Sequence, residues 1–163
     1  MPQRRDLLLS GAALLAGCGF ELRRAPDLQF RTVQLRGFAT TSPLAKELHR
    51  SIDASRNTRV VDSAVQAQVV LEALSEAREK SVVASTATGE VREFQLRSRL
   101  NFRLRTVSGK ELIPASEILL TRDLSYSESA ALAKEQEEAF LYRAMQSDIV
   151  SQVLRRLAAV QIL

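Results

Sequence analysis

The two side chains best suited to nucleophilic or acid–base chemistry each occur once in this chain. Cys18 is the sole cysteine and His49 the sole histidine among 163 residues. A single cysteine excludes an intramolecular disulfide. One cysteine and one histidine are also too few for a zinc site of the usual nitrogen and sulfur type. The thiol of Cys18 is therefore the first candidate for chemistry, because a thiolate is a good nucleophile.

The residues before Cys18 have the three parts of a secretory signal peptide. Arg4 and Arg5 form a positive region, residues 7–16 are apolar, and small residues precede the cysteine. The apolar run is about half of the ~20 residues that a membrane-spanning helix needs. The sequence Leu15-Ala16-Gly17-Cys18 resembles a bacterial lipobox. In a lipobox the cysteine sulfur receives a diacylglycerol, the chain is cleaved just before it, and the new N-terminus is acylated.

We therefore predict residues 1–17 as a lipoprotein signal peptide, residues 18–27 as a lipidated tether and residues 28–163 as a single domain. Two or more acyl chains on Cys18 give stable membrane attachment. Gly19 stands where an aspartate would favour retention in the inner membrane, so we expect the periplasmic face of the outer membrane. The paired arginines also loosely resemble a twin-arginine signal, which leaves Sec and Tat export open. An ordinary cleaved signal with an incidental cysteine is the alternative.

The bulk composition is that of an ordinary globular domain, with 45% hydrophobic and 26% charged residues. The net charge of +4 suits an anionic partner without selecting one. Aromatic residues make up 5% of the chain and tryptophan is absent, which argues against a base-stacking surface for nucleic acid. No glycine-rich phosphate loop is found, and no non-covalent cofactor is expected.

The hydrophobic pattern predicts the order strand, helix, three strands, helix. Ser42-Pro43 resembles a helix start, followed by an apolar stripe at every fourth residue and a stop near Asn57. This order predicts an α+β two-layer sandwich, with a four-stranded, mostly antiparallel sheet and two α-helices packed on one face. The expected strands are 28–36, 67–77 with a possible continuation to 90, 94–107 and 112–123, and the last helix begins near 133.

The strand over residues 94–107 has the clearest period of two. Apolar residues face one way, and the other face carries Arg97, Arg99, Arg103 and Arg105. One interpretation is a solvated face that protects the sheet from aggregation. The other is an anion-binding surface, because guanidinium groups pair with phosphate in a bidentate manner. Lipopolysaccharide is the abundant phosphorylated neighbour of an outer-membrane lipoprotein.

Three separate segments carry a family resemblance. They are Cys18-Gly19-Phe20-Glu21-Leu22-Arg23, Glu93-Phe94-Gln95-Leu96, and Ala131-Leu132-Ala133-Lys134-Glu135 followed by Asp148, Gln152, Leu154 and Arg155-Arg156-Leu157. In this order they resemble the LptE family of lipopolysaccharide-assembly lipoproteins. The resemblance implies a two-helix, four-stranded protein that plugs the outer-membrane barrel LptD and helps to assemble it. It also implies binding of lipopolysaccharide on its way to the outer leaflet.

The resemblance points to two basic positions for lipopolysaccharide binding. Lys134 matches one of them. The other falls just before the turn containing Gly89, where Ala87 and Thr88 stand instead. Lys80 and Arg92 are the possible substitutes.

Two other functions remain open from the sequence. One alternative is another outer-membrane lipoprotein adaptor, such as an activator of cell-wall synthesis. A periplasmic hydrolase would need His49, yet this residue lies off the apolar stripe of its helix and no G-x-S-x-G motif accompanies it. We interpret His49 as a solvated helix residue and the protein as a non-enzyme.

Overall fold

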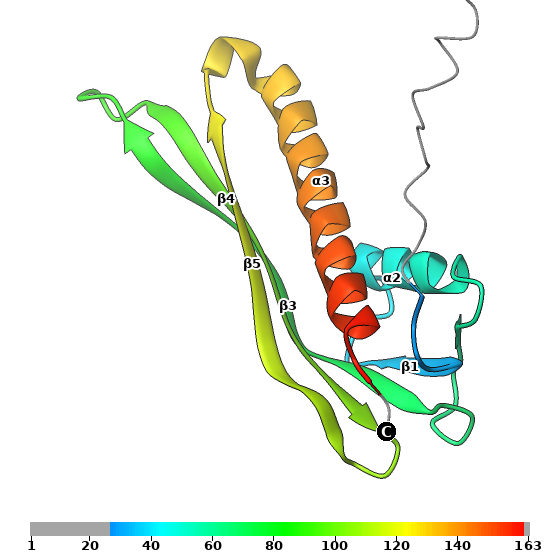
Figure 1. Ribbon diagram of the computed structural model, residues 1–163. Coiled ribbons are helices and arrows are strands. Elements are labelled where there is room, and N and C mark those ends of the chain that lie inside the picture. Colours follow the sequence, from blue (N-terminus) through cyan, green and yellow to red (C-terminus); the bar gives the residue numbers. More distant parts are fainter. Residues whose placement is uncertain (1–26, 162–163) are drawn as a thin grey trace, which may run out of the picture.

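The computed structural model describes residues 27–161 (Figure 1). The predicted signal peptide, Cys18 and nearly all of the tether lie outside the described residues. The elements are β1 (Thr32–Arg36), α2 (Pro43–Asp53), β2 (Arg59–Val60), β3 (Val69–Ser85), β4 (Val91–Thr106), β5 (Glu111–Ser125), a 3₁₀ turn η2 (Glu128–Ala130) and α3 (Ala131–Ala158).

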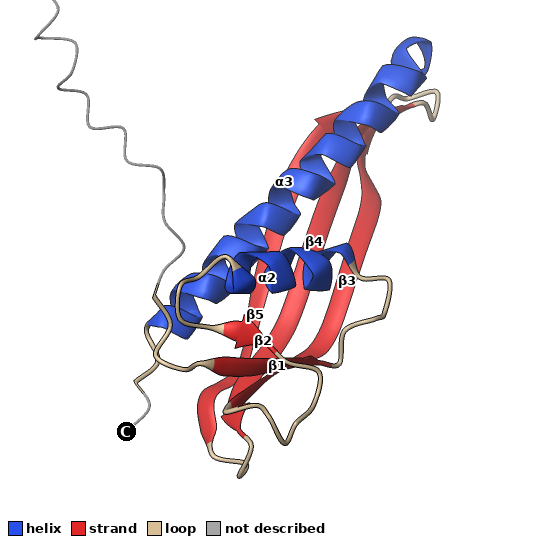
Figure 2. Ribbon diagram, turned by 90° about the vertical axis from the view of Figure 1, so that its right-hand side faces the viewer, coloured by secondary structure: helices blue, strands red, loops and turns tan. Residues whose placement is uncertain are grey.

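One mixed sheet has the strand order β2-β1-β3-β4-β5. β1 runs parallel to both of its neighbours, whereas β3, β4 and β5 form an antiparallel meander. Both helices lie on the same side of this sheet (Figures 1 and 2). The predicted α+β class is therefore confirmed.

The predicted number of four strands is wrong, because the sheet has five. β2 contains only two residues, which is too short to produce a period of two in the sequence. Its pairing depends on backbone bonds to a distant strand, such as Val61 N–H donating to the Val33 carbonyl at 2.9 Å. A strand held in this way has no local sequence signal.

α2 begins as predicted and ends earlier. Ser42 caps the helix by accepting a hydrogen bond from the Ala45 N–H at 3.0 Å, and Pro43 takes the first helical position. The stripe of Leu44, Leu48 and Ile52 is buried. The helix ends at Asp53 rather than near Asn57. Asp53 accepts a hydrogen bond from the Val60 N–H at 2.8 Å, so the chain turns at once towards β2.

The 28-residue helix α3 runs along the meander (Figure 2) and joins two hydrophobic clusters. Its C-terminal half packs residues such as Ile149, Val153 and Leu157 into the main core, together with α2 and β1. Further towards its N-terminus, Met145 packs with Leu96 and Leu124 in a smaller cluster. Beyond that cluster, polar contacts such as the Lys80–Glu138 ion pair join α3 to the sheet.

Gly37 connects β1 to α2 where the backbone passes close to β3. Its φ of +79° lies in the left-handed region, which favours glycine. A Cβ atom at this position would collide with the backbone carbonyl of Ala73. Both the turn and the close approach therefore require glycine here.

Candidate functional site

The predicted basic face is present on the side of the sheet that the helices leave uncovered. Arg97, Arg99, Arg103 and Arg105 alternate along β4 with buried residues such as Leu100 and Phe102. The Arg156 guanidinium lies over the Phe102 ring at 5.6 Å, which places the buried residues on the α3 side. The sequence period of two thus identified the correct face.

Carboxylates from the neighbouring strands accompany three of these four arginines. Arg103 Nη2 lies 2.7 Å from Glu72 Oε2, and Arg105 Nε lies 3.6 Å from the same oxygen. Arg99 lies 3.7 Å from Glu117 and 4.0 Å from Glu79. We call this group of three arginines and three glutamates the charge ladder. It links β3, β4 and β5, and it compensates most of the positive charge on this face.

The electrostatics of the charge ladder are clearest at Glu72. The hydrogen bond from Arg103 holds the pKa of the Glu72 carboxyl below its ordinary value of 4.5. The nearby charges of Arg103, Arg105 and Arg36 act in the same direction, and partial burial opposes them. Glu72 therefore stays ionised in mildly acidic solution.

Arg97 differs from the other three arginines. Its Nε and Nη2 donate to Gln95 Oε1 at 2.9 and 2.6 Å, and no carboxylate of residues 27–161 lies within 4.0 Å of it. Its side chain is also exposed. Of the four predicted arginines, Arg97 is therefore the most available to an external anion.

Lys134 lies at the N-terminal end of α3, which is also the end of the molecule where the β3–β4 hairpin turns (Figure 1). Its ammonium donates to Glu137 at 2.8 Å and to the Ser125 hydroxyl at 3.0 Å. Lys80 reaches the same end of α3 from β3, where it contacts Glu138 at 2.6 Å. The structure thus brings Lys134 and Lys80 to adjacent glutamates on one helix.

Of the two substitutes considered from the sequence, Lys80 is the one that packs against α3. Its ammonium also lies over the Phe94 ring, 4.1 Å from the ring centre, an attractive cation–π geometry. Arg92 instead pairs with Glu90 at 3.2 Å, close to the hairpin turn. We call Lys80 and Lys134 the distal lysine pair.

A polar layer beneath the distal lysine pair was missed by the sequence analysis. Arg78 donates to Gln146 at 2.6 Å, and the Tyr142 hydroxyl donates to the Glu79 carbonyl at 2.8 Å. Burial raises the pKa of the Tyr142 hydroxyl, and the Glu138 charge adds to this effect. The sequence feature that indicates this layer is the spacing of Glu76, Arg78 and Lys80 at every second residue. This spacing places three charged residues on the helix-facing side of β3.

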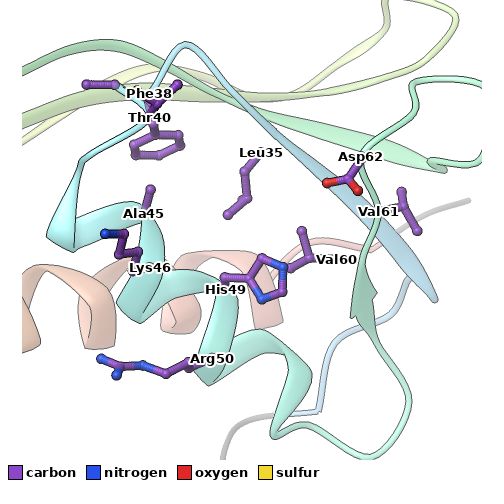
Figure 3. Close-up of a pocket in the computed structure, with 11 residues that line it drawn as sticks. Leu35, Phe38, Thr40, Ala45, Lys46, His49, Arg50, Val60, Val61 and Asp62 are labelled. Carbon is purple, nitrogen blue, oxygen red and sulfur yellow. The ribbon is translucent and has the colours of Figure 1, made fainter.

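A separate groove of about 680 Å³ lies between α2 and the β1–β2 edge (Figure 3). His49 is one of its lining residues, and its Nδ1 lies 3.0 Å from Asp53 Oδ2. The other Asp53 oxygen accepts the Val60 N–H, so this histidine supports the turn into β2. Thr40 supplies the only hydroxyl side chain among the described lining residues.

Between residues 27 and 161, no group of three or more His, Cys, Asp or Glu side chains is arranged to hold a metal ion. No helix in this range is both long and apolar enough to cross a membrane.

The family model "LptE: Lipopolysaccharide-assembly" matches residues 30–157. The LPS-assembly lipoprotein LptE of Pectobacterium atrosepticum is 27% identical over 165 residues, which cover 98% of this chain and 88% of the relative.

Two solved structures have the same fold. Lipoprotein B from Nitrosomonas europaea has a TM-score of 0.74 and 34% identity, over 86% of this chain and 91% of that one. The rare lipoprotein B from Shewanella oneidensis has a TM-score of 0.67 at 22% identity, over 79% and 95% of the two chains. The matches confirm the resemblance that the three sequence segments carry.

Proposed function

Because the chain belongs to the LptE family of non-enzymatic lipopolysaccharide-assembly lipoproteins, we propose that it plugs and helps to assemble the LptD barrel. In this proposal it binds lipopolysaccharide during transport to the outer leaflet, and it is held at the periplasmic face of the outer membrane. The family match over residues 30–157 carries the proposal, since this range covers nearly all of the described domain. Family membership also removes the hydrolase interpretation of His49.

The first part of the proposal is lipid attachment at Cys18. The lipobox-like Leu15-Ala16-Gly17-Cys18 supports it. The alignment with the Pectobacterium lipoprotein covers 98% of this chain, so it extends into the predicted signal peptide. Acyl groups on Cys18 would confine the domain to the membrane, where the barrel is embedded. Confinement raises the effective concentration of the two partners and so favours their association.

The second part is insertion into the barrel. The lumen of a large outer-membrane barrel is polar. The charge ladder offers a matching surface, because it presents both signs of charge on the uncovered face of the sheet. Compensated charges meet a polar wall at a lower desolvation cost than unpaired charges do.

The third part is binding of lipopolysaccharide, whose phosphates we place first at the distal lysine pair and Arg97. Lys80 of β3 and Lys134 of α3 each form an ion pair with a glutamate near the N-terminal end of α3, Glu138 and Glu137 respectively. Arg97 has no carboxylate partner among the described residues. Arg99, Arg103 and Arg105 remain secondary contacts in this proposal, since a phosphate there has to compete with the glutamates of the charge ladder.

The test of the barrel partnership is affinity purification of the tagged protein after detergent extraction of membranes. We expect a large outer-membrane barrel, of about 26 strands, to co-purify in stoichiometric amount. Recovery of a cell-wall synthase without a barrel would favour the adaptor interpretation instead. Recovery of neither protein would contradict both functions.

The test of cargo binding is titration with purified lipopolysaccharide. Charge reversal in Lys134→Asp on α3 is expected to weaken binding. Lys80→Asp on β3 is expected to have the same effect. Lys110→Asp is the matched control, because Lys110 is exposed in the β4–β5 turn at the other end of the meander. Equal affinity for Lys134→Asp and wild type would rule out this site.

A further inference from the structure

The groove between α2 and the β1–β2 edge is separate from the charge ladder and the distal lysine pair. Its volume of about 680 Å³ is within the range of about 300–1,000 Å³ that is usual for small-ligand sites. Its floor is formed by half-buried apolar side chains, including Leu35, Phe38, Val60 and Val61. Leu35, Phe38 and Val60 remain partly open to solvent although they pack against the main core. An apolar ligand would therefore gain burial here.

Two cationic side chains, Lys46 and Arg50, and the imidazole of His49 line one wall of this groove. Lys46, His49 and Arg50 project from consecutive turns of α2, and all three are exposed (Figure 3). Within residues 27–161, neither Lys46 nor Arg50 has a carboxylate within 4.0 Å. Among the described lining residues Asp62 is the one acidic side chain, and it lies on the opposite wall. The groove therefore combines an apolar floor with a cationic rim.

The edge strand beside the groove is poorly suited to binding a peptide as an added strand. The Val60 N–H of β2 already donates to Asp53 at 2.8 Å. The Val61 N–H donates inwards to β1, and the Asp62 carbonyl accepts from the Gln34 side chain at 2.7 Å. Strand addition depends on free main-chain groups. Recognition in this groove must therefore come from its apolar floor and its side-chain charges.

The position of the groove connects it with the membrane. The described chain enters the fold at Leu28 and Phe30, which are buried, and then continues into β1, one wall of the groove. Residues 18–27 form the only link to Cys18, and ten residues span at most about 35 Å. If Cys18 is acylated, as proposed above, the start of the fold at Leu28 stays within this distance of the lipid surface, and β1 leads from there into the groove.

We propose that this groove binds an anionic phospholipid of the anchoring membrane. One acyl chain lies on the floor formed by Leu35, Phe38, Val60 and Val61. The phosphate pairs with Lys46 and Arg50, whose long side chains are free to move over it. His49 uses Nδ1 towards Asp53, so its Nε2 remains as a further polar contact. Asp62 disfavours a more highly charged head group.

The experiment uses the full chain carrying Cys18→Ser, which lacks acyl groups of its own. Methyl resonances of Leu35, Val60 and Val61 are followed by NMR during titration with dihexanoyl phosphatidylglycerol. Dihexanoyl phosphatidylcholine has the same chains and a neutral head group overall, and inorganic phosphate has the charge without the chains. We expect saturable shifts with the phosphatidylglycerol. The phosphatidylcholine should bind at least about fivefold more weakly. Inorganic phosphate should give no saturable shift.

Matched substitutions separate this site from general charge effects. The double variant Lys46→Ala and Arg50→Ala should weaken phosphatidylglycerol binding about five- to tenfold. The variant Lys110→Ala and Arg143→Ala removes two exposed charges elsewhere and should leave binding unchanged. Asp62→Asn should strengthen binding, a gain that a folding defect cannot imitate.

Equal binding of the two lipids would overturn the proposal, as would equal loss in both double variants. The same holds if no methyl group of the groove responds. Each result is independent of the barrel, because the titration contains neither LptD nor lipopolysaccharide. A titration without binding therefore does not contradict the proposed plug function. A purification without a barrel likewise does not contradict the lipid site, which the titration alone tests.

Discussion

Arg103 on β4 places both Nε and Nη2 at 2.7 Å from a single oxygen, Oε2, of Glu72 on β3. The two residues are direct partners in the antiparallel register. Arg105 lies 3.6 Å from the same oxygen, so one carboxylate serves two guanidinium groups. The arrangement explains how a face rich in arginine is tolerated beside the core. The carboxylates separate like charges that would otherwise repel each other along β4.

The first prediction concerns the pH dependence of stability. Glu72→Gln should lower the free energy of unfolding at pH 7 by about 1 kcal/mol, as for a partly exposed ion pair. The pKa of Glu72 in the folded state lies below its ordinary 4.5. Its contribution is therefore complete above about pH 4.5 and is lost as the pH falls through the lowered value.

Urea denaturation at several pH values measures this effect. The difference between wild type and Glu72→Gln should shrink on acidification below the ordinary pKa. Glu111→Gln is the control, since Glu111 is exposed and pairs with no cation of the described residues within 4.0 Å. A difference that persists unchanged at pH 3 would show that the loss is not electrostatic.

The second prediction concerns Gly37. Gly37→Ala should destabilise the fold by about 2 kcal/mol or more. The added Cβ would collide with the Ala73 carbonyl, and alanine is strained at the positive φ of this position. Gly109→Ala provides the comparison. Gly109 has a φ of +96° but nothing within 4 Å of the added atom, so only backbone strain of about 1 kcal/mol is expected. Thermal melts of equal midpoint for the two variants would contradict the close approach at Gly37.

The third prediction compares two leucines on the two helices. Leu48 on α2 is fully buried in the main core, and Leu48→Ala should cost about 2–5 kcal/mol. Leu132 on α3 is 72% exposed, and Leu132→Ala should change stability by less than about 0.5 kcal/mol. Guanidinium denaturation of both variants gives the two values. A large loss at Leu132 would mean that this end of α3 packs against protein in solution.

The fourth prediction concerns membrane attachment. Cys18→Ser should move the protein from the membrane fraction to the soluble periplasmic fraction, because the thiol that accepts the lipid is gone. The described domain does not include Cys18, so the far-UV circular dichroism and the melting temperature should not change. Mass spectrometry of the wild-type N-terminal peptide is the direct check. An unmodified Cys18 in that peptide would refute the acylation.

The sequence was most informative where a hydrophobic period was long. The alternation along β4 identified its two faces, and the stripe of Leu44, Leu48 and Ile52 identified the buried side of α2. Both patterns are informative because burial repeats regularly. Every second side chain is buried along β4, and every fourth is buried along the stripe of α2. The last helix was also recognised, although it starts two residues before the expected position, at Ala131.

The sequence was least informative where structure depends on distant partners. β2 is held by β1 and by the Asp53 side chain, and nothing within its two residues indicates this. The partners of Arg99, Arg103 and Arg105 are another example. The arginine side chains indicated that an anion binds to them. The strand register places glutamates of the same sheet beside them instead. The pairing of Lys80 with Glu138 is likewise set by the tertiary packing of α3 on β3.

The parallel pairing of β1 with β3 has a consequence for the order of folding. Val33 pairs with Val69, and β2 pairs in turn only with β1, so the first third of the domain is incomplete until β3 is available. The β3–β4–β5 meander, by contrast, is built from strands that follow one another in the chain. Local hairpins close at a smaller entropic cost than distant parallel strands. During synthesis from the N-terminus, β1 and α2 are therefore made early and completed late, when the later residues supply β3.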